Sequence, residues 1–368
     1  MKIKRISFKN FRNISCEKLN PSPGINIIYG DNAQGKTNII EGLWLFTGDR
    51  SFRSSVDGNL IKIDADGPTE LNMDYESSGL DINCQICLYP QKKYQLNYVK
   101  LKSRTNLSGE FYAVIFSPNH LSLIKNGPDE RRKFIDQTIC QLKPKYIRVL
   151  HDFNRVIYQR NSLLKNLNRN QSINSTLDVW DYHLARLTST IVKTRYTYLK
   201  KLSAYAVEFY RGISSSKEEL SVIYNSKFYE NGDLAFDTES ILKIIKENRK
   251  EDIVTGTSNY GAHRDDVDFM LDNRLARSFA SQGQQRSIVL ALKLAECEMI
   301  MDTSGEEPIV LLDDVMSELD ESRRDYILNK MGKRQVFITC CDKTQFEKIE
   351  KGKAFLVENG KIIKESFW

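Results

Sequence analysis

Residues 30–37 constrain the fold of this chain more than any other stretch, because they read G-x-x-x-x-G-K-T. The run at 25–29 is rich in β-branched residues, and apolar residues recur at helical spacing over 39–46. A glycine-rich loop between a strand and a helix is the setting of a phosphate-binding P-loop, whose amides and helix N-terminus attract anions. The predicted nucleotide-binding residues are Gly30, Asp31, Asn32, Ala33, Gln34, Gly35, Lys36, Thr37 and Asn38.

The end of this loop and a distant acidic pair carry the expected chemistry. Lys36 can place a cation between the β- and γ-phosphates of ATP, and Thr37 can offer a hydroxyl to Mg²⁺. Far downstream, an apolar run ends in Asp313 and Asp314, which indicates a strand buried in a parallel sheet with acids at its ligand-binding end. We expect Asp313 to hold Mg²⁺ through water and Asp314 to polarise the attacking water. The alternative is that the two acids only cap the next helix.

The distance between the two motifs narrows the class of protein. Lys36 and Asp313 lie 277 residues apart (313 minus 36). P-loop kinases and GTPases place the acidic strand much closer to the loop. A chain that leaves the nucleotide domain and returns is the layout of an ATPase head built from two separated segments.

A second candidate anion site lies at residues 281–286, which read S-Q-G-Q-Q-R and open an apolar helical pattern. Ser281, Gly283 and Gln284 stand at the expected helix N-terminus, where amides and the helix dipole favour a negative charge. One phosphate tail needs only one P-loop, so we expect this motif to contact the nucleotide of a second copy of the chain. The alternative is an ordinary helix cap.

Pattern changes along the chain predict an α/β protein with an inserted helical part. Strand-like alternation over 47–117 predicts an antiparallel sheet, and helical periodicity predicts two long arms at 144–168 and 177–212. The short run 94–99 is expected to be one strand, and a polar turn is expected at 168–175. The predicted divisions are 1–118 for the first part of the head, 119–215 for the helical lobe and 216–368 for the second part of the head.

Composition excludes several classes of protein. The 368 residues are 40% hydrophobic and 28% charged, which is enough for a sizeable core. No apolar run is long enough for a transmembrane helix, so we expect no membrane association. Seven cysteines at no framework spacing indicate reduced thiols and a cytoplasmic location. The net charge of +6 permits a polyanion partner without requiring one. Cys84 and Cys87 are expected on opposite faces of one strand, which disfavours a zinc site.

Taken together, these motifs resemble the RecF family of bacterial DNA recombination and repair proteins, which are relatives of the SMC and ABC-type ATPases. The resemblance covers the chain from end to end. It rests on the runs 30–38, 127–136, 260–266, 281–286 and 312–320. There are two departures from the family pattern: Ala262 stands where proline is usual, and the pair Cys340 and Cys341 stands where threonines near the γ-phosphate are usual.

The resemblance implies a fold and a function. The fold would be an ABC-type P-loop ATPase head with an antiparallel β subdomain and an inserted helical lobe. The function would be that of an ATP- and Mg²⁺-dependent homodimer that hydrolyses ATP weakly in a DNA-dependent manner. Its DNA partners would be double-stranded DNA and gapped or junction DNA with an adjacent single strand. Its protein partners would be RecO and RecR, with which it would help to load recombinase at the nucleoid.

DNA contacts are expected from basic residues near the start of the helical lobe, with a solvated basic face as an equal alternative for each. The main candidates are Arg131, Arg132, Lys133, Lys145 and Arg148. Further basic residues on the first arm are Lys143, Arg155, Arg160, Lys165 and Arg169. Arg12 can reach a phosphate or lie solvated on an edge strand, and His263 and Arg264 can couple the nucleotide to the second lobe, although a structural histidine is the favoured interpretation.

Two other functions are weighed against this one. A P-loop phosphotransferase acting on a small-molecule acceptor would need a short spacing between the loop and the acidic strand. A nuclease fused to an ATPase head would need a further domain after Asp313, where only 55 residues remain (368 minus 313).

Overall fold

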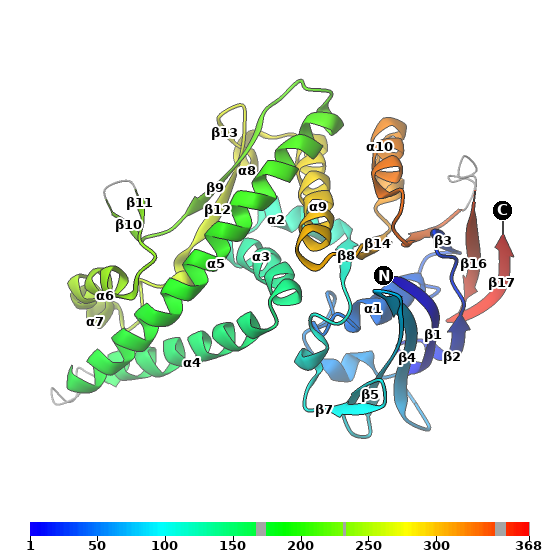
Figure 1. Cartoon of the computed structure of the whole chain (residues 1–368), viewed down its shortest axis with the longest axis horizontal. Coiled ribbons are helices and arrows are strands. Elements are labelled where there is room, and N and C mark those ends of the chain that lie inside the picture. Colours follow the sequence, from blue (N-terminus) through cyan, green and yellow to red (C-terminus); the bar gives the residue numbers. More distant parts are fainter. Residues whose placement is uncertain (167–173, 231–232, 343–350, 368) are drawn as a thin grey trace. The chain divides into compact units, whose positions relative to one another are not determined.

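The computed structural model describes residues 1–166, 174–230, 233–342 and 351–367, and it divides into two compact units (Figure 1). The first unit is formed by Met1–Leu121 and Leu290–Trp368, and the second by Ser122–Val289. The first unit is therefore discontinuous, because it is built from two segments that are distant in sequence. Residues 216–289, which we predicted to belong to the head, lie in the second unit, because β9 (Leu220–Asn225) pairs with β12 (Asp266–Leu271) and packs on α5 (Asn174–Ser214).

The first unit contains two six-stranded sheets. The antiparallel sheet has the order β2 (Ile14–Leu19), β1 (Lys2–Phe11), β4 (Thr69–Ser77), β5 (Leu80–Tyr89), β6 (Lys93–Leu96) and β7 (Val99–Leu101). The second sheet has the order β17 (Lys361–Phe367), β16 (Gly352–Glu358), β3 (Ile25–Tyr29), β15 (Val336–Cys340), β14 (Ile309–Asp313) and β8 (Ala113–Phe116). Only β17 runs antiparallel to its neighbour in that sheet.

Helix α1 (Lys36–Leu45) connects the two sheets of this unit, because it contacts β1 of one and β14 and β15 of the other. Its apolar side chains, such as Ile40 and Leu43, belong to a core that also takes residues from both sheets. Helix α10 (Glu321–Met331) follows the acidic strand, and α9 (Gln282–Ser304) runs from the second unit into the first. Short 3₁₀ turns lie at Asp57–Leu60, Arg104–Leu107, Pro118–Leu121 and Met316–Glu318.

The second unit is mainly helical. The antiparallel arms are α4 (Lys145–Asn166) and α5, which meet through the buried pair Leu164 and Leu177. The other helices are α2 (Ser122–Lys125), α3 (Pro128–Leu142), α6 (Thr238–Glu247), α7 (Arg249–Thr255) and α8 (Ala276–Phe279), with a 3₁₀ turn at Ala262–Arg264. A small sheet has the order β13 (Arg274–Leu275), β12 and β9, and β10 (Tyr229–Glu230) pairs with β11 (Asp233–Leu234).

Most predicted elements are confirmed, including the strand before the P-loop, the acidic strand and both arms. The prediction of one strand at 94–99 is wrong. Asn97 and Tyr98 adopt positive φ angles of 47° and 66° and form a turn that splits the run into β6 and β7. The predicted turn at 168–175 lies almost entirely outside the described residues.

Candidate functional site

The P-loop connects β3 to α1 and has the curled backbone that its glycines allow. Gly30 and Gly35 have φ angles of 143° and 111°, and Ala33 also lies at a positive φ. A Cβ at residue 30 would meet the carbonyl oxygen of Val357 at 2.3 Å, so glycine is required there. The N–H groups of Lys36 and Thr37 precede the first hydrogen bond of α1, which Asn38 donates to the Gly35 carbonyl at 3.0 Å, so these two amides are available to an anion.

Lys36 is turned back onto the loop. Its Nζ donates hydrogen bonds to the carbonyl oxygens of Gly30 at 2.6 Å and Asp31 at 2.8 Å, and the side chain is buried. A buried ammonium normally has an anionic partner. Here it is satisfied by neutral carbonyls alone, so the same group can move to phosphate oxygens.

Contacts from two other segments brace the loop. Asn13 donates to the carbonyl of Gln34 at 3.1 Å and accepts from the Asn38 amide at 2.8 Å. The β16–β17 turn donates two backbone N–H groups, from Asn359 to Gln34 Oε1 at 2.5 Å and from Gly360 to the Gln34 carbonyl at 2.8 Å. The N-terminal hairpin and the C-terminal hairpin therefore hold the phosphate loop from two sides.

The acidic strand ends beside the P-loop helix. Asp313 Oδ1 accepts hydrogen bonds from the Thr37 hydroxyl at 2.8 Å and from the Thr339 hydroxyl at 3.0 Å. The parallel order β3, β15, β14 brings these residues together, because the carboxyl ends of parallel strands meet at one edge of the sheet. Burial raises the pKa of Asp313, and the two hydroxyl donors oppose that shift. The structure thus brings together Thr37 and Asp313, the two residues expected to hold Mg²⁺.

Asp314 is held by its backbone and not by its side chain. Its N–H donates to Thr339 Oγ1 at 2.9 Å, and its φ of 56° is unusual for a residue with a Cβ. No described residue hydrogen-bonds the Asp314 carboxylate, and the side chain is partly exposed. Backbone strain of this kind recurs at functional sites and leaves this carboxylate free to orient a water molecule.

Two arginines, Arg12 and Arg53, lie near the P-loop and make contacts that the sequence did not predict. Arg12 forms a two-pronged ion pair with the buried Glu41, at 2.8 and 2.6 Å, so it is neither solvated nor free for a phosphate. Arg53 donates to Asn38 Oδ1 at 2.7 Å, remains 41% exposed, and its charge opposes the rise in the pKa of Asp313. Arg53 is thus a second cation within electrostatic range of the site. It lies in an irregular segment, where no sequence pattern singled it out.

The two cysteines at the end of β15 have different surroundings: Cys340 is the last residue of the strand, and Cys341 follows it. Cys340 is buried, which raises the pKa of its thiol to about 12. Cys341 is exposed, and its Sγ lies 3.2 Å from Asn32 Oδ1 of the P-loop. The raised pKa of Cys340 disfavours the thiolate that a nucleophilic cysteine needs.

The motif at 281–286 lies in the second unit and opens α9. Ser281 Oγ accepts from the Gln284 N–H at 3.2 Å, and Gln284 Oε1 accepts from the Ser281 N–H at 2.6 Å, which is a capping box. Gln284 also donates to Glu218 at 2.5 Å. Ser281 is exposed and Gly283 is partly exposed. The capping role is observed, and the predicted contact with a second copy stays a prediction.

The basic candidates fall into two groups. Arg131 is buried and bonded to both carboxylate oxygens of Asp266 and to two carbonyls, and Arg132 bonds the Asp265 carbonyl and Asp129. The burial of Arg131 corrects its assignment as a DNA contact, whereas Arg132 is partly exposed and its DNA contact stays a prediction. Lys133, Lys145 and Arg148 are exposed. Arg160 is fully buried among carboxylates, so it too is corrected, and Arg169 lies outside the described residues.

The run 260–266 is a structural centre of the second unit. His263 Nε2 lies 2.9 Å from the Ser258 carbonyl, and burial lowers the pKa of His263 to about 4. Asp265 accepts from the Tyr224 hydroxyl at 2.6 Å, and burial raises the pKa of Asp265 to about 6. The carbonyl of Ala262 accepts from Arg195 at 2.6 Å. The structural role favoured for His263 agrees with these contacts.

The residues present fit a nucleotide triphosphate with a hard divalent cation. The curled loop and Lys36 suit phosphate oxygens, while one carboxylate with neighbouring hydroxyls suits Mg²⁺, which keeps several waters and phosphate ligands. Among the described residues, no cluster of three or more His, Cys, Asp or Glu side chains could hold a metal by itself. In the same part of the chain, no helix is long and apolar enough to cross a membrane.

A P-loop strand and an acidic strand of one parallel sheet, supplied by two ends of the chain, define a P-loop ATPase head of the ABC and SMC class. The model of the RecF/RecN/SMC N terminal domain matches residues 2–364. The chain belongs to this family, and within it to the RecF branch, as its relatives indicate.

Curated relatives include the DNA replication and repair protein RecF of Acetivibrio thermocellus, 42% identical over 356 residues that cover 94% of this chain and 95% of the relative. That of Ruminiclostridium cellulolyticum is 38% identical over 352 residues and covers 94% of each chain. A solved structure of the recombination mediator protein RecF-ATP in the RecFOR pathway is 34% identical, with a TM-score of 0.89, and covers 100% of this chain and 97% of that one. The Smc head domain of Pyrococcus furiosus shares the fold at 16% identity, with a TM-score of 0.56, covering 100% of this chain and 96% of that chain. The predicted fold class and family are confirmed.

Proposed function

We propose that this chain is an ATP-dependent DNA-binding protein of recombinational repair and replication. The observation that carries the proposal is the 2.8 Å contact between Thr37 of the P-loop and Asp313 of the acidic strand, two groups that together suit Mg²⁺ and the phosphates of ATP. Relatives named DNA replication and repair protein RecF support the biological context, and a relative's structure with ATP supports the nucleotide. The phosphotransferase alternative is not favoured by these relatives.

Each of the predicted site residues in the first unit has a role in this proposal. The loop from Gly30 to Asn38 binds the phosphates, and Lys36 leaves its two carbonyl partners to neutralise the β- and γ-phosphates. Thr37 and Asp313 hold Mg²⁺, which supplies charge stabilisation at the phosphates when bound. Asp314 orients the attacking water through a carboxylate that no described residue engages.

The assembly part of the proposal is an ATP-driven homodimer. Ser281, Gly283 and Gln284 of one copy contact the nucleotide of the other, so that ATP closes the dimer and forms a DNA-binding surface. The supporting observations are the exposed Ser281 and the anion-attracting first turn of α9, a helix of 23 residues. The proposal includes weak DNA-dependent ATP hydrolysis, binding of gapped or junction DNA, and RecO and RecR as partners in recombinase loading at the nucleoid.

The experiment is a mass measurement in solution with and without ATP and Mg²⁺. We use the wild type, the slow-turnover variant Asp314→Asn, the P-loop variant Lys36→Ala and the trans variant Ser281→Arg. The wild type and Asp314→Asn should dimerise with ATP, while the other two should remain monomers. Thr197→Arg, an exposed position on α5, is the matched control for an added arginine and should dimerise normally. A wild-type monomer at saturating ATP would refute the dimer.

A second measurement tests the reaction. ATP turnover should be slow, should rise when gapped duplex is added, and should be lost in Asp314→Asn even though that variant still binds ATP. If a small-molecule acceptor increased turnover more than DNA does, the phosphotransferase alternative would replace the proposal.

A further inference from the structure

The exposed face of α4 carries a regular series of polar side chains, which we call the basic stripe. It comprises Arg148, His151, Arg155, Tyr158, Ser162 and Lys165. These residues recur in steps of three and four, which places them on one side of a helix, and all six are exposed. At about 1.5 Å per residue the stripe extends for roughly 25 Å along α4.

Within the part of the chain that the structure describes, no carboxylate pairs with the three cations of the stripe. No described residue forms an ion pair or hydrogen bond through the side chain of Arg148, Arg155 or Lys165. Arg160, on the other side of the same helix, is buried and paired with two aspartates. The one acidic residue of α4, Asp152, contacts His151 at 3.6 Å. The helix thus satisfies its inward arginine and leaves its outward ones available.

Tyr158 indicates which kind of polyanion fits this face. Its side chain is 73% exposed although a tyrosine ring is costly to leave in water, and it lies between Arg155 and Lys165. Aromatic rings set among cations are the arrangement on which single-stranded nucleic acids stack their bases while phosphates meet the charges. A membrane surface needs an apolar face, and no aliphatic side chain of α4 is exposed.

We propose that the basic stripe binds single-stranded DNA, with phosphates on Arg148, Arg155 and Lys165 and one base stacked on Tyr158. This inference rests on the proposed function and names a surface for its DNA binding. It also gives the single strand beside a duplex a separate binding surface within the second unit. A duplex would use the same cations, but its stacked bases would leave Tyr158 without a role.

The test measures fluorescence anisotropy of a labelled oligothymidylate and of a labelled duplex, over a range of salt concentrations. Arg148→Gln with Arg155→Gln should lower the slope of log K against log salt by about 1.4, since each single-strand phosphate contact contributes about 0.7. Tyr158→Ala should weaken oligothymidylate binding about tenfold, whereas Tyr158→Phe, which keeps the ring, should bind like the wild type.

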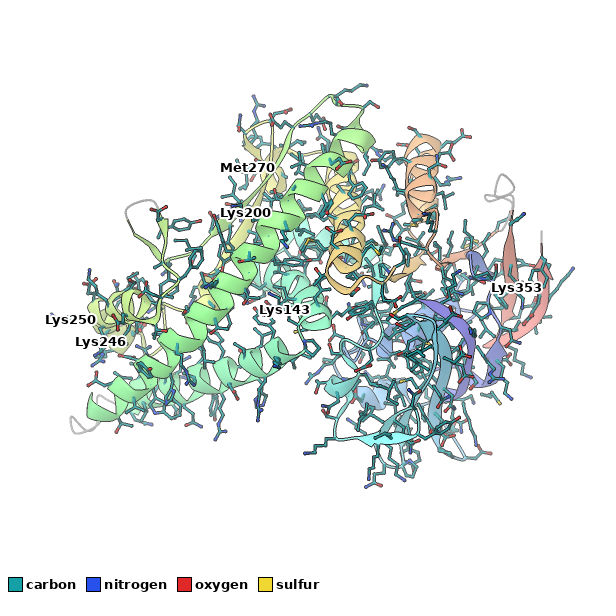
Figure 2. All side chains as sticks on the ribbon, viewed as in Figure 1. Lys143, Lys200, Lys246, Lys250, Met270 and Lys353 are labelled. Carbon is teal, nitrogen blue, oxygen red and sulfur yellow. The ribbon has the colours of Figure 1, made fainter. Side chains whose placement is uncertain are left out.

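The matched control replaces two exposed lysines elsewhere in the same unit. Lys246→Gln with Lys250→Gln, on α6 and α7 (Figure 2), removes the same charge and should leave both the affinity and the slope unchanged. If the control variant weakens binding as much as the stripe variant, net charge alone explains binding and the inference fails.

The remaining outcomes separate this inference from the proposed function. If the wild type binds DNA and both stripe variants bind like it, the inference is overturned and the proposed function stands. If the arginine variant weakens duplex and single strand equally and Tyr158→Ala changes neither, the single-strand assignment is overturned. If the wild type binds no DNA with or without ATP, both are overturned.

Discussion

Arg160→Met is the substitution whose effect the structure defines most sharply. The Arg160 guanidinium is fully buried and donates to Asp181 at 2.7 Å, to Asp252 at 2.7 Å and to the Ser258 hydroxyl at 2.8 Å. These partners come from α5, from α7 and from the loop that follows α7. One side chain of α4 therefore connects three other segments of the second unit.

The expected loss of stability follows from the buried carboxylates that the substitution leaves without their arginine partner. Asp181 keeps a hydrogen bond from Arg249 at 2.9 Å, whereas the Asn259 N–H at 2.7 Å is the one donor that the described residues still offer to the Asp252 carboxylate. Both carboxylates are fully buried. Removing one partner of a buried ion pair costs about 3–5 kcal/mol. For a unit of this size, each kcal/mol lowers Tm by roughly 2–4 °C, so the expected loss is about 10 °C.

The assay is thermal unfolding followed by circular dichroism, with hydrogen exchange to locate the loss. Arg155→Met is the matched control, because it makes the same chemical change five positions away on the exposed side of α4. It should change stability by no more than about 0.5 kcal/mol. Faster exchange over residues 249–259 in Arg160→Met alone would place the effect at this cluster.

Two results would refute the reasoning. Equal Tm values for Arg160→Met and Arg155→Met would mean that the buried pairing contributes nothing. The double variant Arg160→Met with Asp252→Asn removes the stranded charge and should recover part of the loss. A further loss in that variant would show that the cost does not come from an unpaired carboxylate.

Three further predictions concern the loop, the acidic strand and the response to pH. Gly30→Ala should abolish ATP binding and destabilise the protein by about 1–3 kcal/mol, because the new Cβ would lie 2.3 Å from the Val357 carbonyl oxygen in a backbone with a φ of 143°. Calorimetric titration with ATP should show normal binding in the control Gly24→Ala, where a Cβ meets open space. Normal ATP binding by Gly30→Ala would contradict the loop geometry. Thr339→Val should lower ATP turnover more than ATP binding, because it removes the acceptor that holds the Asp314 N–H; unchanged turnover beside the exposed control Thr197→Val would exclude that role. Between pH 4 and 6, His263 carries a proton in the unfolded chain but not in the folded chain, so this residue makes the free energy of unfolding rise with pH. Asp265 has the opposite effect, because it keeps a proton in the folded chain that the unfolded chain has lost, so it makes the free energy of unfolding fall with pH. Asp265→Asn should therefore show a rising curve of up to about 1.4 kcal/mol per pH unit and His263→Gln a falling one, and urea unfolding at several pH values would contradict this if both variants behaved alike.

Local patterns were enough to predict the elements that bind phosphate. The P-loop is a contiguous motif, and the acidic strand is an uninterrupted apolar run, so each is encoded within a few residues. The turn at Asn97 and Tyr98 was missed because neither residue is glycine, although asparagine tolerates a positive φ. Arg53 and the pair of Arg12 with Glu41 depend on contacts between distant segments, which no local pattern specifies.

The buried arginines could have been distinguished from the exposed ones by helical phase. Arg160 follows Phe153 and Val156 and precedes Leu164 at steps of three and four, so it lies on the apolar side of α4. Arg148 and Arg155 fall on the opposite side. The same reasoning places Arg131 in phase with the buried Phe134 and Ile135 of α3. Because the basic residues were considered without their helical phase, arginines that have a structural role were predicted to contact DNA.

The strand order explains why the nucleotide site needs both ends of the chain. In the sheet β17-β16-β3-β15-β14-β8, the two strands from the first segment, β3 and β8, are separated by β15 and β14 from the last segment. Residues 1–121 alone therefore cannot pair these strands with each other in their native positions. Because β14 also supplies Asp313, the P-loop gains its acidic partner only when the chain has passed through the whole second unit and returned. Formation of the ATP site is thus coupled to completion of the fold.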